Sequence, residues 1–192
     1  NPNSKGDVTV LYLQNYKQPF AKANDESWKN GEWWTPAVWN QNAASFNAKG
    51  NTTVSGMQYK SEEGLTLAFQ NGWDKEAYTN GKMWQVATLR PGKYRLEVTY
   101  AYTLVVTDAG NFISVLIAKG DSESDIPNVA DLEQLNGVYM AYDKMGTAND
   151  SGTLVTPSFE VTETTDVVIG FLTSLAKGNS YFKVTELKLI LE

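Results

Sequence analysis

The sequence contains no cysteine and no histidine. Without cysteine the chain can form neither a disulfide framework nor a thiolate metal site, and it has no thiolate nucleophile. Without histidine it can form neither a Ser-His-Asp triad nor a histidine-ligated zinc site, and the usual general base near neutral pH is missing. No other catalytic motif is found. We therefore predict that the protein is not an enzyme and has no catalytic residue, no metal site and no cofactor.

The sequence also lacks long apolar runs and clustered positive charge. No run of 18 apolar residues occurs, so we expect no insertion into a membrane. The formal net charge is −6, and this diffuse acidic balance argues against nucleic acid or an anionic membrane as a partner. The chain begins at Asn1 without a methionine, which is typical of a mature or trimmed chain whose signal peptide has been removed.

Alternation with a period of two residues is present almost throughout the chain. In KYRLEVTYAYTLVV (93–106), every second residue from Tyr94 to Val106 is apolar, which predicts a half-buried strand. The preceding Pro91-Gly92 predicts a type II turn with a positive φ at Gly92, and hence a hairpin over 83–106. Further strands are predicted near Val8–Leu13, Leu65–Gln70, Asn111–Ala118, Leu154–Val161, Val167–Leu175 and Tyr181–Leu191.

The last predicted strand changes parity along its length. Phe182 and Val184 are apolar on one parity, and Leu187, Leu189 and Leu191 on the other. A β-bulge near Thr185-Glu186 would return both sets to one face. The pattern also fits a strand that is buried on both sides, or a break into two strands.

Two segments are not strand-like. Residues 119–152 form a long polar connection in which 129–135 favours one or two helical turns. Its apolar residues near Tyr139 indicate that it folds back onto a sheet. Asp121 to Asp125 (DSESD) has acidic residues but lacks the glycine and distal glutamate of a calcium loop, so we interpret it as a solvated turn. The other irregular segment is 15–56.

These elements predict an all-β fold. About eight strands with no long helix are typical of a β-sandwich. No repeat, low-complexity tract or linker divides the 192 residues. We therefore predict a single β-sandwich domain over residues 1–192, with residues 1–30 as an irregular lead-in.

Several stretches resemble a known family. NGKMWQVATLRPGKYRLEVTY (80–100) is similar to the central hairpin of galactose-binding-like jelly rolls. Together with WWTPAVWNQNAA, NFISVLIAKGDSESDIPNVADL, FEVTETTDVVIGFLTS and YFKVTELKL, it resembles a family of uncharacterised domains at the C-terminal ends of surface lipoproteins in glycan-degrading gut bacteria. The resemblance covers about residues 30–192.

The resemblance implies a fold, a role and a location. The implied fold is a galactose-binding-like jelly-roll sandwich of two antiparallel sheets, and the implied role is non-catalytic carbohydrate binding. The implied location is extracytoplasmic, at the cell surface or in the periplasm, after removal of a lipoprotein signal.

Candidate ligand residues follow from what sugars need. Their CH faces pack on aromatic rings, and their hydroxyls need donors and acceptors. Trp73 follows Asn71-Gly72 in a polar loop near Tyr78, and the adjacent Trp33 and Trp34 would point to opposite sides of an extended segment. The predicted ligand-binding residues are Trp73, Trp34, Trp33, Tyr78, Asn71 and Tyr142.

Other aromatic residues are interpreted as structural. We expect Trp84 to be buried on or within a sheet, and Trp39 to be buried as well. Tyr139 and Tyr142 fit either a cleft or the packing of the long connection onto the sheet.

We therefore predict a non-catalytic carbohydrate-binding module of a larger exported or surface protein. Its partners would be an oligosaccharide or polysaccharide glycan and a neighbouring domain. The alternative is a structural or protein-interaction β-sandwich module without a glycan ligand. A carboxylate-dependent glycosidase is a third class, but it requires two carboxylates that face each other across a cleft, which sequence spacing does not show.

Overall fold

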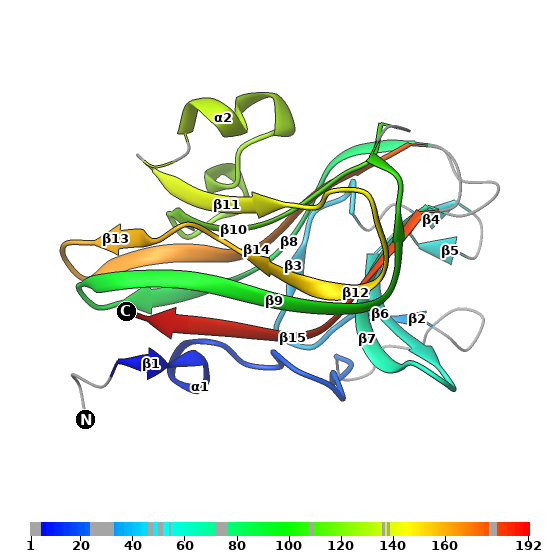
Figure 1. Ribbon diagram of the computed structural model, residues 1–192, viewed down its shortest axis with the longest axis horizontal. Coiled ribbons are helices and arrows are strands. Elements are labelled where there is room, and N and C mark those ends of the chain that lie inside the picture. Colours follow the sequence, from blue (N-terminus) through cyan, green and yellow to red (C-terminus); the bar gives the residue numbers. More distant parts are fainter. Residues whose placement is uncertain are drawn as a thin grey trace.

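Two antiparallel sheets pack face to face in the computed structural model (Figure 1). The structure describes residues 5–23, 33–45, 48–49, 52–53, 55–71, 77–107, 110–135, 137, 139–176 and 180–192. From β8 onward the chain passes repeatedly from one sheet to the other, as in a jelly roll. The predicted all-β sandwich of two antiparallel sheets is confirmed.

The larger sheet has the order β12-β9-β15-β7-β6-β2, with β1 paired to β15 and β13 paired to β9. Its strands are β1 (Gly6–Asp7), β2 (Trp33–Trp34), β6 (Ser55–Lys60), β7 (Gly64–Asn71), β9 (Gly92–Val105), β12 (Ala148–Val155), β13 (Phe159–Val161) and β15 (Ser180–Leu191).

The smaller sheet has the order β11-β10-β14-β8-β3. Its strands are β3 (Asn40–Gln41), β8 (Tyr78–Leu89), β10 (Phe112–Lys119), β11 (Met140–Lys144) and β14 (Thr165–Leu175), and β4 (Ala48–Lys49) pairs separately with β5 (Thr52–Thr53). The helices are α1 (Thr9–Tyr12), α2 (Leu132–Leu135) and the 3₁₀ turns Glu123–Asp125 and Val129–Asp131. None of the helices in the described part of the chain is long and apolar enough to cross a membrane.

The strands predicted near 65–70, 111–118, 167–175 and 181–191 are present as β7, β10, β14 and β15, and the helical turns at 129–135 are also confirmed. The strand predicted over 154–161 is two strands, because Pro157 between β12 and β13 has no N–H for a ladder.

The strand predicted over 8–13 is wrong, because this segment contains α1. The Asp7 carboxylate accepts hydrogen bonds from the Thr9 N–H and hydroxyl at 3.0 and 2.5 Å, which stabilises the turn. Val10 and Leu11 then point into solvent, where they are 73% and 69% exposed.

The predicted hairpin over 83–106 is also wrong. β8 pairs with β14 and β3, whereas β9 pairs with β15, β12 and β13, so the two strands lie in opposite sheets. Arg90-Pro91 carries the chain across the sandwich, and the Tyr94 hydroxyl donates to the Arg90 carbonyl at 2.9 Å across this corner. Gly92 pairs with Val161 and does not have a positive φ.

Gly92→Ala should therefore lower the free energy of unfolding by less than about 1 kcal/mol. The added Cβ would meet Leu191 Cδ1 at 2.6 Å. This atom is the far end of a partly exposed side chain that can rotate away. Urea denaturation measures the change, and a loss above about 2 kcal/mol would show that the corner is sterically fixed.

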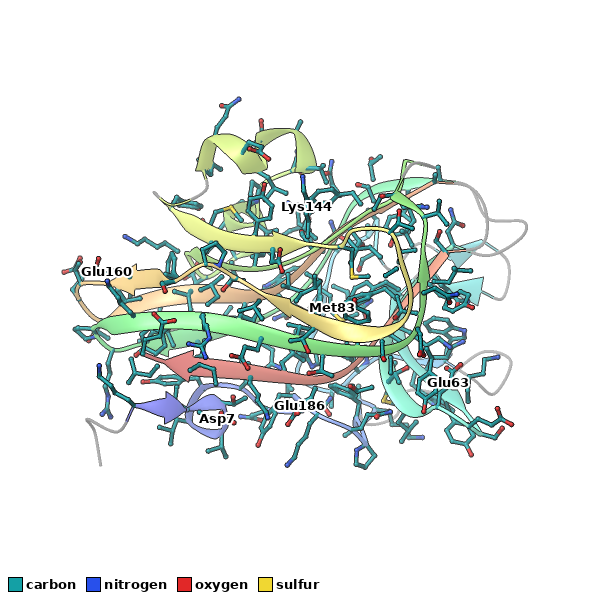
Figure 2. The ribbon with its side chains drawn as sticks, viewed as in Figure 1. Asp7, Glu63, Met83, Lys144, Glu160 and Glu186 are labelled. Carbon is teal, nitrogen blue, oxygen red and sulfur yellow. The ribbon has the colours of Figure 1, made fainter. Side chains whose placement is uncertain are left out.

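The main core fills the space between the sheets (Figure 2). Phe69 and Phe182 from the larger sheet meet Phe171 from the smaller one, with ring centroids 4.8 and 6.3 Å from that of Phe171. Trp39 packs on the same ring at 5.7 Å and is buried, as predicted. Met83 lies fully buried in this layer.

A second apolar cluster lies on the outer face of the smaller sheet, under residues 120–135, 137 and 139, which we call the cover. The cluster consists of Trp84, Leu116, Ala118, Ile126, Leu132, Met140, Val168 and Leu172. Tyr139 and Tyr142 pack partly against it. The predictions that the long connection folds back onto a sheet and that Trp84 packs on a sheet face are both confirmed. The prediction that 119–152 is not strand-like is wrong at its end, because β11 and the first part of β12 lie there and pair with β10 and β9.

The last strand carries a β-bulge at Thr185. Val184 pairs with Tyr100 of β9 and Glu186 pairs with Thr99, so Thr185 has no residue opposite it. The bulge returns four residues to the inter-sheet core: Phe182, Val184, Leu187 and Leu189. Of the three interpretations of the parity change, the bulge is confirmed.

Candidate functional site

Strand β9 also contains a β-bulge, and it decides where an aromatic ring points. Tyr100 pairs with Gly152 of β12, but Thr103 pairs with Asp150, so β9 has two residues where β12 has one. Thr103 is buried after the bulge, and Tyr102 is 42% exposed. The predicted continuous apolar face from Tyr94 to Val106 is therefore wrong beyond Tyr100.

The backbone at this point is unusual on both strands. Tyr102 has a φ of 51° and Asp150 a φ of 101°. Left-handed backbone at a non-glycine residue costs about 1–3 kcal/mol, and such residues cluster at functional sites. Two of them next to each other on paired strands mark this part of the larger sheet as a candidate site.

A hollow of about 310 Å³ lies at this bulge, and we call it the tyrosine hollow. It is lined by Glu63, Tyr102, Thr103, Asn149, Asp150 and Tyr181. Within the described residues, the side chains of Asn149 and Asp150 and both tyrosine hydroxyls make no hydrogen bond. The hollow therefore offers two rings, a carboxylate and an amide to a ligand.

The floor of the tyrosine hollow is fixed by a buried charge. Lys183 on β15 forms an ion pair with Glu63, and its Nζ lies 5.4 Å from the centroid of the Tyr181 ring. The Lys183 N–H donates to the Thr103 hydroxyl at 3.1 Å, and Gln18 Nε2 donates to the Glu63 carbonyl at 2.8 Å. These contacts hold the 61–63 turn and the bulge in place, so the hollow is preformed.

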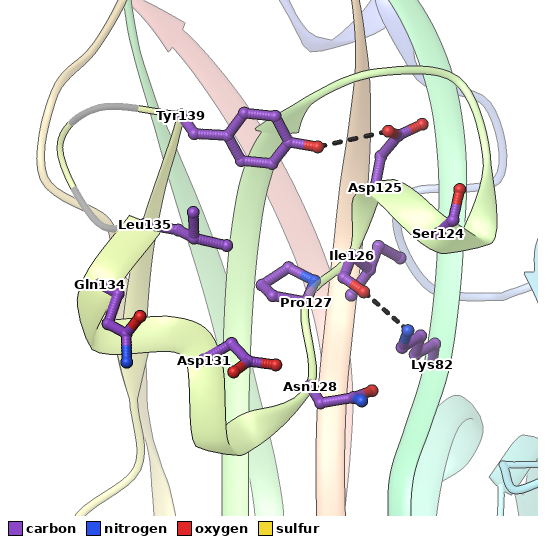
Figure 3. Close-up of a pocket in the computed structure, with 10 residues that line it drawn as sticks. All are labelled: Lys82, Ser124, Asp125, Ile126, Pro127, Asn128, Asp131, Gln134, Leu135 and Tyr139. Atoms are coloured by element: carbon purple, nitrogen blue, oxygen red, sulfur yellow. Dashed lines mark hydrogen bonds between the residues drawn. The ribbon is translucent and has the colours of Figure 1, made fainter.

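A larger hollow of about 620 Å³ lies in the cover, on the other sheet (Figure 3). We call it the cover hollow. Tyr139, Leu135 and Pro127 supply its apolar surface. Its polar lining includes three residues whose side chains have no hydrogen-bond partner within the described residues: Asn128, Asp131 and Gln134.

Two charged groups hold the walls of the cover hollow. Lys82 of β8 is buried, and its Nζ donates to the Ile126 carbonyl at 2.6 Å (Figure 3). Burial lowers the pKa of Lys82. The Asp125 carboxylate accepts hydrogen bonds from the Ser122 hydroxyl at 2.8 Å, from the Ser122 N–H at 3.0 Å and from the Tyr139 hydroxyl at 3.2 Å. These hydrogen bonds, that of the Ser122 hydroxyl above all, lower the pKa of Asp125. Burial and the Asp125 charge raise the pKa of Tyr139.

Three of the predicted ligand residues are enclosed by the protein. Trp33 is only 1% exposed, and the Asn71 amide donates to the carbonyl of Ala176 at 2.5 Å. The Tyr78 hydroxyl shares a hydrogen bond of 2.9 Å with Thr173, and burial raises its pKa. Because their rings and amide are used inside the fold, we assign these residues to packing instead of ligand contact.

The other predicted residues lie apart from one another. Trp34 is partly exposed while Trp33 is buried, which confirms that the two rings point to opposite sides. Trp34 lines an apolar hollow of about 430 Å³, where Lys22 Nζ lies 6.0 Å from its ring. The Tyr142 hydroxyl donates to Glu133 at 3.0 Å, and burial raises the Tyr142 pKa. Trp73 lies outside the described residues and stays a prediction.

Sequence reasoning missed the residues of the tyrosine hollow. Tyr102 was placed on the core face because its alternation with Tyr100 is regular in the sequence. The sequence feature that could have indicated the bulge is Asn149-Asp150, since both residue types tolerate a left-handed backbone and so favour a bulge or turn. Tyr181 gives no separate signal at the start of its strand.

The chain belongs to the family described as Domain of unknown function (DUF5013), whose model matches residues 14–170. The expected membership in a family of uncharacterised domains is thereby confirmed. A comparison with curated proteins finds no match.

Several solved structures are similar in outline. The enzymatically active domain of bacteriophage CBA120 tailspike protein 4 is 9% identical with a TM-score of 0.48, covering 81% of this chain and 20% of that one. TmCBM61, solved with β-1,4-galactotriose, is 12% identical with a TM-score of 0.41, covering 94% and 98%. The xylan-binding module CBM15 is 14% identical with a TM-score of 0.42, covering 89% and 97%. These values are too low to carry a ligand from those proteins to this chain.

Proposed function

We propose that the protein is a non-catalytic carbohydrate-binding module and that the tyrosine hollow is its ligand site. The observation that carries the proposal is the pairing of Tyr102 and Tyr181 with the unpartnered side chains of Asn149 and Asp150 around one preformed hollow. Sugars need this combination of ring faces and hydrogen-bonding groups.

The chemistry of each group suits a saccharide. The exposed Tyr102 ring offers an apolar face to the CH groups of a sugar ring. The Asp150 carboxylate can accept hydrogen bonds from two neighbouring hydroxyls, and the Asn149 amide can donate and accept. A shallow site of this kind should bind with about −4 to −7 kcal/mol, which is a dissociation constant from millimolar to about ten micromolar.

Substitutions in the hollow test the proposal. Tyr102→Ala and Asp150→Asn should each weaken binding at the tyrosine hollow at least about tenfold, which is about 1.4 kcal/mol. Asn is chosen at 150 because it tolerates the left-handed backbone there. Retardation in native gels containing soluble xylan, galactan, mannan or β-glucan identifies the bound chain, and titration with its hexasaccharide measures the affinity.

The matched control is Tyr59→Ala. Tyr59 is also an exposed tyrosine of the larger sheet, at 44%, but it does not line the tyrosine hollow. Its removal should leave binding unchanged. A folded Tyr102→Ala protein that binds as many hexasaccharides as the wild type, at full affinity, would remove the tyrosine hollow as the site.

The proposal extends to the setting of the module. The resemblance to domains of surface lipoproteins supports a larger exported or surface protein that is extracytoplasmic and has lost its signal, with a neighbouring domain beside this one. Immunolabelling of intact cells that express the full-length protein tests this location.

A protein-interaction module is the second candidate. The observation in its favour is the pair Val10 and Leu11, which expose apolar side chains on α1. These two adjacent apolar side chains offer a small contact surface to a partner. Pull-down with the neighbouring domain, lost on Val10→Ser with Leu11→Ser, would support this role.

A further inference from the structure

We propose that the cover hollow is a second saccharide site, so that the module holds two glycan chains at once. This inference rests on the proposed carbohydrate-binding function and adds a site to it. The two hollows lie on different sheets: the tyrosine hollow at the β9–β12 bulge, and the cover hollow above the outer face of β8 and β10.

The lining of the cover hollow has the two kinds of group that a saccharide needs. Tyr139 is an aromatic ring that is partly exposed, with Leu135 and Pro127 beside it. Asn128, Asp131 and Gln134 are exposed. Figure 3 shows the Leu135 side chain and the Asp131 carboxylate pointing inward, towards Pro127 and below the Tyr139 ring. The carboxylate can accept hydrogen bonds from sugar hydroxyls while the apolar surface meets the CH groups.

The charged groups that are already paired have a different role. Lys82 Nζ donates hydrogen bonds to the Ile126 and Glu123 carbonyls. The Asp125 carboxylate accepts hydrogen bonds from Ser122, Asp121 and Tyr139. They fix the walls of the cover hollow before any ligand arrives. A preformed hollow avoids the cost of ordering a loop on binding.

The volume of the cover hollow fits this assignment. At about 620 Å³ it is twice the size of the tyrosine hollow and lies in the range of sites for small ligands. It is large enough for more than one sugar ring, so the second site should contact a longer stretch of the chain than the first.

Two sites on different sheets have a measurable effect. A module with both sites links separate polysaccharide chains, and its apparent affinity for a polymer exceeds that for a short oligosaccharide because the second contact is intramolecular. A module with one site does neither.

The test uses the full chain and four proteins: wild type, Tyr102→Ala with Asp150→Asn, Asp131→Ala with Gln134→Ala, and all four substitutions together. The probes are soluble xylan, galactan, mannan and β-glucan, and the hexasaccharide of whichever chain is bound. We expect calorimetric titration to give two hexasaccharides per wild-type protein and one per doubly substituted protein. The protein with all four substitutions should bind none. Only the wild type should make the polysaccharide solution turbid.

The matched control is Asp121→Ala. Asp121 is an exposed carboxylate of the cover that does not line the hollow, so its loss changes the charge equally. It should leave the stoichiometry at two, and thermal melts check that every variant is folded. A wild-type stoichiometry of one, with binding lost only through Tyr102 and Asp150, would overturn the second site and leave the proposed function intact. Absence of binding to all four polysaccharides would overturn both.

Discussion

Gly170→Ala should lower the free energy of unfolding by at least about 3 kcal/mol. Gly170 lies in the middle of β14, paired with Trp84 of β8 on one side and Leu116 of β10 on the other. A Cβ there would meet the Met83 carbonyl oxygen at 2.1 Å and Trp84 Cα at 2.7 Å. Both are backbone atoms of a paired central strand, so no side-chain rotation relieves the clash.

The control for this prediction is Gly146→Ala. A Cβ at Gly146 meets no atom within 4 Å, and its φ is not positive. It should change the free energy of unfolding by less than about 0.5 kcal/mol. Urea denaturation followed by tryptophan fluorescence measures both variants, and equal stabilities would mean that β8 and β14 can separate locally at no cost.

Trp84→Ala should destabilise the protein by about 3–5 kcal/mol. The ring is buried in the outer cluster, where it packs with residues of the sheet and of the cover such as Ile126 and Leu132. Its removal leaves a cavity that neighbours on a flat sheet cannot fill. The cover also loses an apolar contact with the sheet, so its backbone amide groups should exchange their hydrogens with solvent faster.

Val86→Ala is the matched control for Trp84→Ala. Val86 lies two residues further along β8 on the same outer face, but it is 41% exposed. Its truncation should cost less than about 1 kcal/mol. If Trp84→Ala were equally mild, the outer cluster would contribute little to stability, and the cover would be held mainly by hydrogen bonds such as those of Lys82 to Ile126 and of Val129 to Asn80.

Much of the sandwich could be predicted because period-two patterns are local. Val167–Leu175 and the last strand each carry their own burial pattern, and even the bulge at Thr185 shows as a change of parity. The segment 8–13 failed because a short apolar run fits a strand or a helical turn equally well. There, two hydrogen bonds from Thr9 to Asp7 decided the outcome.

Pairing between strands could not be predicted in the same way. Pro91-Gly92 indicates a sharp change of direction, but strands on either side of it can pair in one sheet or face each other across a core. Leu89 and Tyr94 both point into the inter-sheet core, and that shared burial is what places β8 and β9 in opposite sheets. Only the contacts of the whole chain contain this information.

The candidate site depends even more strongly on contacts between distant parts of the chain, which local sequence patterns do not contain. Tyr102 has the sequence environment of a core residue, and its exposure depends on a register shift that involves β9, β12 and β15 together. Asp150 and Tyr181 come from distant parts of the chain. The expectation that an aromatic ring of the adjacent pair Trp33 and Trp34 contacts a sugar led instead to Trp33, which is a buried ring of the fold.

The pairing of β1 with the end of β15 determines how the module would respond to tension. Gly6 lies opposite Leu191 and Asp7 opposite Ile190, so β1 lies beside the last residues of β15 (Figure 1). Pulling the start of β1 away from the end of β15 would place the force first on the outermost pair, Gly6 and Leu191. The contacts would then open one after another, as in a zipper, instead of all at once by shear along the strands. The next to part would be the two hydrogen bonds that join Val8 and Thr9 to Leu189. A stretched chain would thus open along β1 and α1 while the tyrosine hollow and the cover hollow keep their shape.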